Sequence, residues 1–288
     1  MTTEERTMTA PLTFDLGGDL TVNRLGYGTM WLTGTGVWGE PADRPAAVRV
    51  VQAAVEQGVN FIDTADSYGP MVTERIIADA LHPYPDGVVV ATKVGNARPA
   101  PNVFVPVGHP AYLKQQVELS LRLLKTERID LMQLHRIDPE VPLADQLGAL
   151  SELKAEGKIR HIGLSEVTVE QLKEARSITE IAGVQNLYNL VTRQSQDVLD
   201  YATAENIAFI PWFPMAMGKL AQPGSPVADL AAELDATPAQ VALAWLLHIS
   251  PVVLPIPGTT SLDHLTENLQ AAKLSLTDDE VARLNSLA

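Results

Sequence analysis

Short runs of apolar and β-branched residues recur along the chain, and most are separated by stretches in which apolar residues repeat every three or four positions. The first pattern is typical of buried β-strands, and the second is typical of helices with one apolar face. Eight runs are predicted as strands, at residues 24–28, 59–63, 88–93, 129–134, 159–164, 182–185, 207–211 and 252–256. The clearest predicted helices are residues 46–57, 112–124, 143–155 and 238–247, the last with Thr237 as its expected cap.

Strands and helices that alternate in this way predict a parallel sheet closed into a (β/α)8 TIM barrel. The alternative is an open, doubly wound sheet, which would need a glycine-rich phosphate loop after an early strand. Gly26 and Gly28 lack the third glycine of that motif. No internal segment resembles a linker, so we expect a single domain over residues 1–288, with residues 1–10 as a flexible tail.

Connecting segments are expected to cover both ends of this barrel. Residues 13–26 predict an N-terminal β-hairpin that turns at Gly17 and Gly18 and covers one end. The stretches 95–110 and 214–226 are rich in proline and glycine and predict long loops on the carboxyl-terminal face. Long loops on that face of a barrel are usually functional.

Composition narrows the choice of partners and compartment. Of the 288 residues, 46% are apolar and 19% are charged, which is enough apolar material for a large core. The 21 basic and 35 acidic residues give a net charge of −14, which argues against nucleic acid or an anionic membrane as a partner. No cysteine is present, which excludes disulfides, thiolate zinc sites and cysteine nucleophiles. The first residues lack a signal-peptide pattern, and the most apolar stretch, 241–257, is too short to span a membrane, so we expect a cytoplasmic protein.

Polar residues stand where three consecutive predicted strands end. Asp63 follows the second strand and is itself followed by Tyr68, Lys93 ends the third strand, and His135 follows the fourth. Each residue alone is more often a turn residue, a solvated residue or part of the core. Because the carboxyl ends of barrel strands meet on one face, the four together predict a catalytic site there.

These residue types suit the transfer of a proton to a carbonyl oxygen. A tyrosine has an ordinary pKa of about 10, and we expect the adjacent Lys93 ammonium to lower it. Asp63 would pair with Lys93, and His135 would hydrogen-bond the carbonyl oxygen. None of these groups supplies a hydride, so a reduced nicotinamide is expected to do so. The residues therefore predict an NAD(P)H-dependent carbonyl reductase with Tyr68 as its acid.

The same residues resemble a known family over nearly the full length of the chain. The matching motifs are Asp63-Thr64-Ala65 with Tyr68-Gly69, Thr92-Lys93, Leu134-His135, the run from Gly157 to Ser165, Gln185-Asn186-Leu187-Tyr188-Asn189, Ile256-Pro257-Gly258-Thr259 and Glu267-Asn268. In this combination they are similar to the aldo-keto reductases. The resemblance implies a (β/α)8 barrel, usually NADPH as cofactor, a monomer, and a catalytic tetrad of Asp63, Tyr68, Lys93 and His135.

The resemblance also implies which residues bind the cofactor. Ser165 and Gln185 resemble the residues that hold the nicotinamide carboxamide, and Trp212 stands where a tyrosine commonly stacks on the nicotinamide. The loop that begins at Met215 would run over the pyrophosphate, and the backbone near Thr259 leads into a helix start that suits a phosphate. The implied cofactor residues are Gly28, Thr29, Met30, Asp63, Ser165, Glu166, Gln185, Trp212, Phe213, Pro214, Met215, Gly218, Leu220, Ile256, Gly258, Thr259, Thr260, His264, Glu267 and Asn268.

The sequence departs from the family pattern at three of these positions. Glu166 stands where asparagine usually follows the serine, and an ionised carboxylate accepts hydrogen bonds but does not donate them. His264 stands where an arginine often holds the 2′-phosphate, and Thr260 lies in a stretch that carries a basic residue in many members. We therefore expect NADPH as the cofactor, with NADH or the use of both as the alternative.

Aromatic residues of the expected loops predict the substrate pocket. Trp31, Trp38 and Phe104 would form its walls and favour a flat or apolar carbonyl compound. Within the family, several segments, 210–214 among them, look similar to a bacterial branch that includes pyridoxal reductases, so pyridoxal or another aromatic aldehyde is the expected substrate. Arg136 has two interpretations, a structural role or the recognition of a phosphate or carboxylate.

Two other functions are alternatives to the reductase. A non-catalytic nicotinamide-binding regulatory module would have less need of all four tetrad groups. A metal-dependent hydrolase built on Asp63 and His135 would need several converging ligands, and the six histidines are scattered, so no metal is expected. The tetrad therefore favours the reductase.

Overall fold

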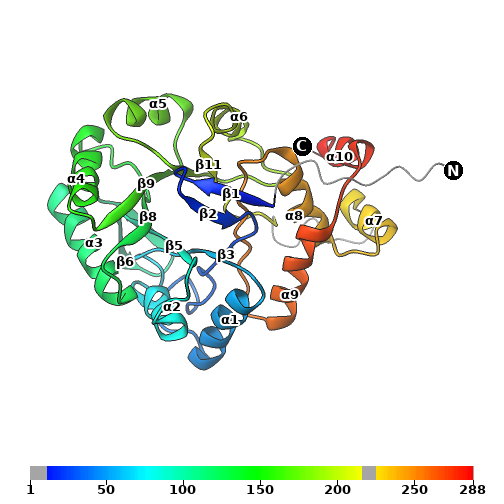
Figure 1. Cartoon of the computed structure of the whole chain (residues 1–288), viewed down its shortest axis with the longest axis horizontal. Helices are drawn as coiled ribbons and strands as arrows, with labels where there is room; N and C mark the ends of the chain where they lie inside the picture. The colour runs from blue at the N-terminus through cyan, green and yellow to red at the C-terminus, as the bar shows by residue number, and fades with distance from the viewer. Residues whose placement is uncertain (1–11, 216–224, 288) are drawn as a thin grey trace.

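The computed structural model describes residues 12–215 and 225–287, and the expected tail at residues 1–10 lies outside this range (Figure 1). Its centre is a seven-stranded parallel sheet in the order β11-β10-β9-β8-β5-β4-β3. The strands are β3 (Tyr27–Gly28), β4 (Phe61–Asp63), β5 (Val89–Val94), β8 (Ile129–Leu134), β9 (Ile159–Ser165), β10 (Gly183–Gln185) and β11 (Ala208–Phe209). All of them fall on runs that the sequence predicts as strands.

The eighth predicted strand closes the barrel in an irregular form. On one side the N–H of Leu254 donates to Phe209 O at 2.8 Å, and on the other the N–H of Gly26 donates to Pro255 O at 2.9 Å. Pro255 and Pro257 have no N–H, so this segment cannot form a continuous ladder and is joined to β11 by an isolated bridge only. Its hydrogen bonds to both edges of the seven-stranded sheet confirm the (β/α)8 barrel.

Most helices surround the sheet in Figure 1 and bury an apolar face against it, whereas α7 packs on α8 and α10 packs on α7 further out. They are α1 (Arg44–Glu56), α2 (Val72–Leu81), α3 (Pro110–Leu124), α4 (Leu143–Ala155), α5 (Val169–Ile178), α6 (Gln196–Ala204), α7 (Pro226–Glu233), α8 (Pro238–Ile249), α9 (Leu262–Gln270) and α10 (Asp278–Asn285), with a short 3₁₀ turn η1 (Ala271–Lys273). The predicted bounds of α4 are correct, and Thr237 caps α8 as predicted by accepting from the N–H of Gln240. No helix in the described ranges is long and apolar enough to cross a membrane.

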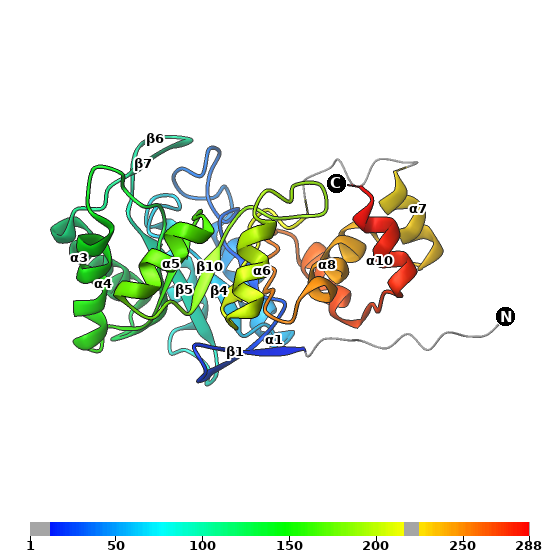
Figure 2. The same ribbon diagram turned by 90° about the horizontal axis from the view of Figure 1, so that it is seen from above.

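The predicted N-terminal hairpin is present as β1 (Thr13–Leu16) and β2 (Leu20–Asn23). Gly17 and Gly18 have φ values of 63° and 82°, which side-chain-bearing residues rarely adopt, and this explains the turn. Asp19 in the turn contacts His161 near the start of β9, with 2.6 Å between Oδ1 and Nε2. The hairpin therefore covers the amino-terminal end of the barrel, as Figure 2 shows.

A second hairpin occupies part of the stretch that the sequence predicts as a long loop. β6 (Asn96–Ala100) and β7 (Val103–Pro106) pair antiparallel across a turn in which Asn102 has a φ of 59°. The prediction missed this hairpin because its prolines, among them Pro99 and Pro101, resemble loop residues and its β7 side chains are largely exposed. It stands at the carboxyl-terminal end of the barrel, opposite the β1–β2 hairpin (Figure 2).

Candidate active site

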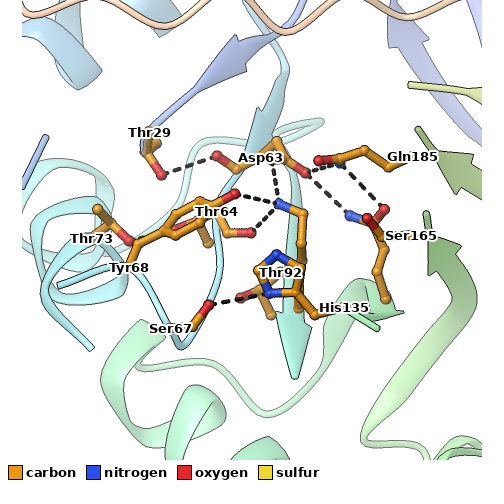
Figure 3. A network of polar contacts seen from close by, with 12 residues as sticks. Thr29, Asp63, Thr64, Ser67, Tyr68, Thr73, Thr92, His135, Ser165 and Gln185 are labelled. Carbon is orange, nitrogen blue, oxygen red and sulfur yellow. Dashed lines mark hydrogen bonds and ion pairs between the residues drawn. The ribbon is translucent and has the colours of Figure 1, made fainter. Parts of the chain in front are cut away.

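The four predicted tetrad residues lie together at the carboxyl-terminal end of the barrel (Figure 3). Asp63 ends β4 and Lys93 lies near the end of β5, while Tyr68 is in the turn before α2 and His135 directly follows β8. All four side chains are buried, and Lys93 is completely inaccessible to solvent. Parallel register places these neighbouring strand ends at one level, which is why residues 72 positions apart along the chain, from 63 to 135, share one site.

The Lys93 ammonium is the centre of this arrangement. Its Nζ donates to Asp63 Oδ1 at 2.6 Å, to the backbone carbonyl oxygen of Thr64 at 2.8 Å and to the Tyr68 hydroxyl at 3.3 Å. These three bonds use the three donors of an ammonium group, so its position is fixed. The expected pairing of Lys93 with Asp63 and Tyr68 is present in the structure.

Two glutamines hold the other side of the Asp63 carboxylate. Oδ2 accepts from Gln185 Nε2 at 2.8 Å and from Gln133 Nε2 at 3.2 Å. Gln133 was not among the predicted site residues. Its sequence signal is a polar residue in β8, whose other polar residue is Asp130, and that signal alone does not say which neighbour Gln133 contacts.

Burial raises the pKa of the Tyr68 phenol above its ordinary value, because the charged phenolate would lose its hydration. The Lys93 ammonium acts in the opposite direction but does not overcome burial. The predicted lowering by Lys93 is present, but burial outweighs it, so the net pKa is raised and Tyr68 is protonated at neutral pH. For Lys93 itself, burial lowers the pKa, but Asp63 and Tyr68 together outweigh it, so the net pKa is raised and the ammonium keeps its charge.

His135 is held in its neutral form. Burial first, and then the positive charges of Lys93, Arg136 and Arg98, place its pKa well below the ordinary value. Its Nδ1 lies 3.2 Å from the Ser67 hydroxyl oxygen, and when Ser67 donates this bond the single ring proton resides on Nε2. Ser67 precedes Tyr68 in the sequence, but only the fold reveals its contact with His135.

A cavity of about 460 Å³ opens beside Tyr68 and His135. Predicted cofactor residues that line it are Gly28, Thr29, Met30, Asp63, Ser165, Gln185, Trp212, Phe213, Pro214, Met215, Ile256 and Gly258. Predicted substrate residues that line it are Trp31 and Phe104. Residues outside those predictions that also line it are Asn96, Pro106 and Arg136.

The remaining predicted residues lie elsewhere. Trp38 is outside the cavity lining and packs near the Arg98 guanidinium, whose Cζ is 5.7 Å from its ring centroid. Glu166 is also outside the lining, and its carboxylate contacts Trp212. Around the start of α9, Thr259 and Asn268 are buried, Glu267 is half-buried, and Thr260 and His264 are exposed. Gly218 and Leu220 fall outside the described residues.

The cavity is predominantly apolar, and Asn96 and Arg136 are polar residues in its lining that the tetrad does not use. Asn96 is 3% exposed, and its side-chain Oδ1 has no hydrogen-bond partner among the described residues. Arg136 donates through Nη1 to His135 O at 2.6 Å and to Ser165 Oγ at 3.0 Å. The described parts of the chain contain no group of three or more His, Asp or Glu side chains that could hold a metal ion.

Comparison with known proteins places this geometry in a family. The model of the aldo/keto reductase family matches residues 24–288. An uncharacterized oxidoreductase of Schizosaccharomyces pombe is 49% identical over 93% of this chain and 87% of its own. Pyridoxine 4-dehydrogenase of Escherichia coli is 43% identical over 96% of this chain and 98% of its own.

A solved structure agrees with the sequence comparison. The aldo-keto reductase from Klebsiella pneumoniae in complex with NADPH superimposes with a TM-score of 0.82 at 29% identity, covering 96% of this chain and 94% of that one. The predicted resemblance is confirmed by both kinds of comparison. The chain belongs to the aldo/keto reductase family and is an oxidoreductase.

Proposed function

We propose that this protein reduces an aromatic aldehyde of the pyridoxal type to its alcohol with NADPH, using Tyr68 as the proton donor. The observation that carries the proposal is the position of Lys93 Nζ, which is 2.6 Å from Asp63 Oδ1 and 3.3 Å from the Tyr68 hydroxyl at the wall of the cavity. The non-catalytic nicotinamide-binding module is disfavoured because such a module needs no proton donor of this kind.

The residues at the cavity fit a nicotinamide carboxamide, which has one acceptor and one donor group. Ser165 Oγ accepts from Arg136, so its own proton is available to a carbonyl oxygen. Gln185 donates from Nε2 to Asp63 Oδ2, and its Oε1 accepts no hydrogen bond in the described parts of the chain. This oxygen can therefore accept from the amide N–H of a carboxamide. When bound, NADPH supplies the hydride that reaches the carbonyl carbon.

The residues of this chain supply the proton and hold the carbonyl group. The neutral His135 donates from Nε2 to the carbonyl oxygen and orients it, which requires the tautomer that Ser67 favours. Tyr68 transfers its hydroxyl proton to the same oxygen as the alkoxide forms, and its raised pKa keeps that proton in place beforehand. The Lys93 ammonium stabilises the resulting phenolate, and Asp63 keeps the ammonium charged.

The test of this function is Tyr68→Phe, which removes the proton and leaves the ring. We expect turnover of pyridoxal, followed by the absorbance of reduced nicotinamide, to fall about 10²- to 10⁴-fold, the usual contribution of a general acid. The dissociation constant for NADPH should stay unchanged, because the hydroxyl contacts Lys93 and not the expected cofactor residues. A variant that kept most of its rate would contradict the assignment, and a wild-type protein that binds NADPH but reduces no aldehyde would favour the non-catalytic module.

Arg136 and Asn96 support an aromatic aldehyde with a neighbouring oxygen. Pyridoxal carries a hydroxyl group on the ring carbon next to its aldehyde. The guanidinium of Arg136, at the cavity wall, can donate a hydrogen bond to that oxygen. Benzaldehyde and 2-hydroxybenzaldehyde form a matched pair that differs in this oxygen only. We expect wild-type protein to prefer the hydroxylated compound in kcat/KM, and Arg136→Met to reduce that preference about fivefold, the value of one hydrogen bond. An unchanged preference would assign Arg136 the structural role.

Three further expectations from the sequence analysis belong to the proposal. The chain is expected to act as one domain, as a monomer, and in the cytoplasm. Light scattering of the purified protein would measure the mass in solution, and a dimer would contradict the second expectation.

A further inference from the structure

One carboxylate oxygen links the ends of three neighbouring strands beside the cavity. Glu166 directly follows β9, and its Oε1 accepts from the N–H of Leu187 and from the indole Nε1 of Trp212, both at 2.6 Å. Leu187 comes shortly after β10 and Trp212 shortly after β11, and the two form a parallel bridge. Glu166 has a φ of 55°, a conformation rare for a residue with a side chain, so its backbone is held at some energetic cost.

The position of Glu166 separates it from the cavity, while its partner faces the cavity. Trp212 lines the cavity and Glu166 does not. The indole is only partly buried, and its packing partner Phe213 meets it edge-on at 6.1 Å between ring centroids. Such packing alone leaves the ring free to rotate about its own side-chain bonds. A charge-assisted hydrogen bond at Nε1 removes that freedom, because it anchors the edge of the ring.

We propose that Glu166 is a positioning residue, which fixes the plane of the Trp212 indole as the surface against which the nicotinamide ring lies. This rests on the proposed function with NADPH and on the placement that the family resemblance implies, in which Trp212 stacks on the nicotinamide. Glu166 itself acts through Trp212 and touches neither substrate nor cofactor. This explains why a carboxylate stands at position 166: its oxygen accepts hydrogen bonds from two N–H groups, those of Leu187 and Trp212.

A simpler interpretation makes Glu166 a link that merely stabilises the loops after β9 and β10. The two interpretations differ in which part of the cofactor would bind more weakly when Glu166 is replaced. Loss of a general link would weaken the binding of the whole dinucleotide, including its adenosine half. Loss of a positioned indole would weaken only ligands that carry a nicotinamide, so 2′-phospho-ADP-ribose, which lacks that ring, is the discriminating probe.

The experiment compares dissociation constants for NADPH and 2′-phospho-ADP-ribose by calorimetry in four variants. Glu166→Ala removes the acceptor, Glu166→Gln keeps it, Trp212→Phe keeps an aromatic face without the N–H, and Glu166→Ala/Trp212→Phe combines two changes. Glu170→Ala removes an exposed carboxylate four residues later and is the matched control. Unfolding temperatures are measured for each variant to establish that it is folded.

We expect Glu166→Ala and Trp212→Phe each to weaken NADPH binding about tenfold, as for one strong hydrogen bond, and to leave the fragment within about twofold of wild type. Glu166→Gln should bind NADPH like wild type. The double variant should be no weaker than Trp212→Phe alone, because both changes remove the same interaction. If Glu166→Ala does not fold, the same decision rests on Trp212→Phe, whose tenfold loss should again be confined to NADPH.

Three results would overturn the role of Glu166 without contradicting the placement of the nicotinamide on Trp212. They are unchanged NADPH binding in Glu166→Ala, equal losses for NADPH and the fragment, and additive losses in the double variant. Trp212→Ala separates this failure from a failure of the proposed function. If Trp212→Ala binds NADPH as tightly as wild type, the nicotinamide does not lie on Trp212, and both the placement and the role of Glu166 are wrong.

Discussion

The β1–β2 hairpin and the β6–β7 hairpin lie at opposite ends of the barrel and are held in different ways (Figure 2). The first is attached by a half-exposed carboxylate, Asp19, which forms an ion pair with Arg160 and a hydrogen bond with His161. The second is attached by Arg98, which donates to Val103 O within the hairpin, to Ser67 O beside the tetrad and to Gly36 O in the first loop. The guanidinium also lies 3.8 Å from the centroid of the Phe104 ring.

The difference lies in what each hairpin brings to the cavity. No residue of β1 or β2 lines it, whereas β6–β7 contributes Asn96, Phe104 and Pro106. In (β/α)8 barrels the amino-terminal face serves stability and the carboxyl-terminal face serves chemistry. The same motif therefore covers the core at one end and forms part of the cavity wall at the other. Changes in the two hairpins should separate into effects on activity and effects on stability.

The largest effect is expected at the β6–β7 end. Arg98→Ala would release the hairpin from the turn that carries Ser67 and Tyr68, and a shift of catalytic groups by about 1 Å costs up to about 10²-fold in rate. We expect kcat/KM for pyridoxal to fall about 10- to 100-fold, with little change in the unfolding temperature. Arg98→Lys keeps the charge without the forked geometry and should recover only part of the loss. A full rate in Arg98→Ala would show that the hairpin needs no such attachment.

The next largest effect is on stability and concerns Glu74, a buried acid close to the carboxyl-terminal end of the barrel. Glu74, in the first turn of α2, accepts from Thr92 Oγ1 at 2.7 Å, and its Oε2 has no partner in the described residues. Burial raises its pKa to about 7. A carboxyl with a higher pKa in the folded state stabilises the protein fully below its ordinary pKa, and this contribution is lost as the pH rises through about 7.

Glu74→Gln keeps the acceptor for Thr92 and cannot ionise, so it avoids that loss. In urea denaturation we expect the variant to be more stable than wild type by about 2 kcal/mol at a pH of about 9, with the difference shrinking towards a pH of about 5. Glu127→Gln, at an exposed position, is the control and should show no such trend. A difference independent of pH would mean that ionisation of Glu74 is not the cause.

The smallest effect is expected at the amino-terminal end. The Arg160 hydrogen bond, and then His161, lower the pKa of Asp19, so its stabilisation is present above the ordinary pKa and is lost as the pH falls through the lowered value. Because Asp19 is exposed and its ion pairs are screened, Asp19→Asn should cost only about 0.5 kcal/mol at neutral pH. This cost should vanish in acid, and kcat/KM should match wild type. A loss of activity in this variant would contradict the division between the two ends.

The sequence predicted the parts of this molecule that depend on position along strands. Asp63, Tyr68, Lys93 and His135 were found because strand ends in a barrel share one face, and the resemblance to a family then gave the four residues the same roles. The N-terminal hairpin was found because two adjacent glycines permit its turn. The β6–β7 hairpin was missed because its prolines hide the strand pattern.

Other parts depend on distances that no pattern in the sequence encodes. Ser67 contacts His135 only because the turn after β4 brings it to the end of β8, and Gln133 on β8 reaches Asp63 on β4 across the intervening strand β5. The lowering effect of Lys93 on the pKa of Tyr68 was predicted, because the neighbouring charge could be identified, but the burial that outweighs it could not. Glu166 was recognised as unusual, yet its bond to Trp212 depends on the path of two loops.

Two prolines in the closing segment reduce the number of backbone hydrogen bonds at one position in the barrel wall. Pro255 and Pro257 offer carbonyl oxygens to Gly26 and Gly28 but return no N–H, so this seam is joined by fewer bonds than the ladders between β5, β8 and β9. Local opening of a fold begins where such bonds are sparse. The residues that lead into α9 follow the seam directly, so a ligand seated there would bind only the closed barrel and shift this local equilibrium towards closure.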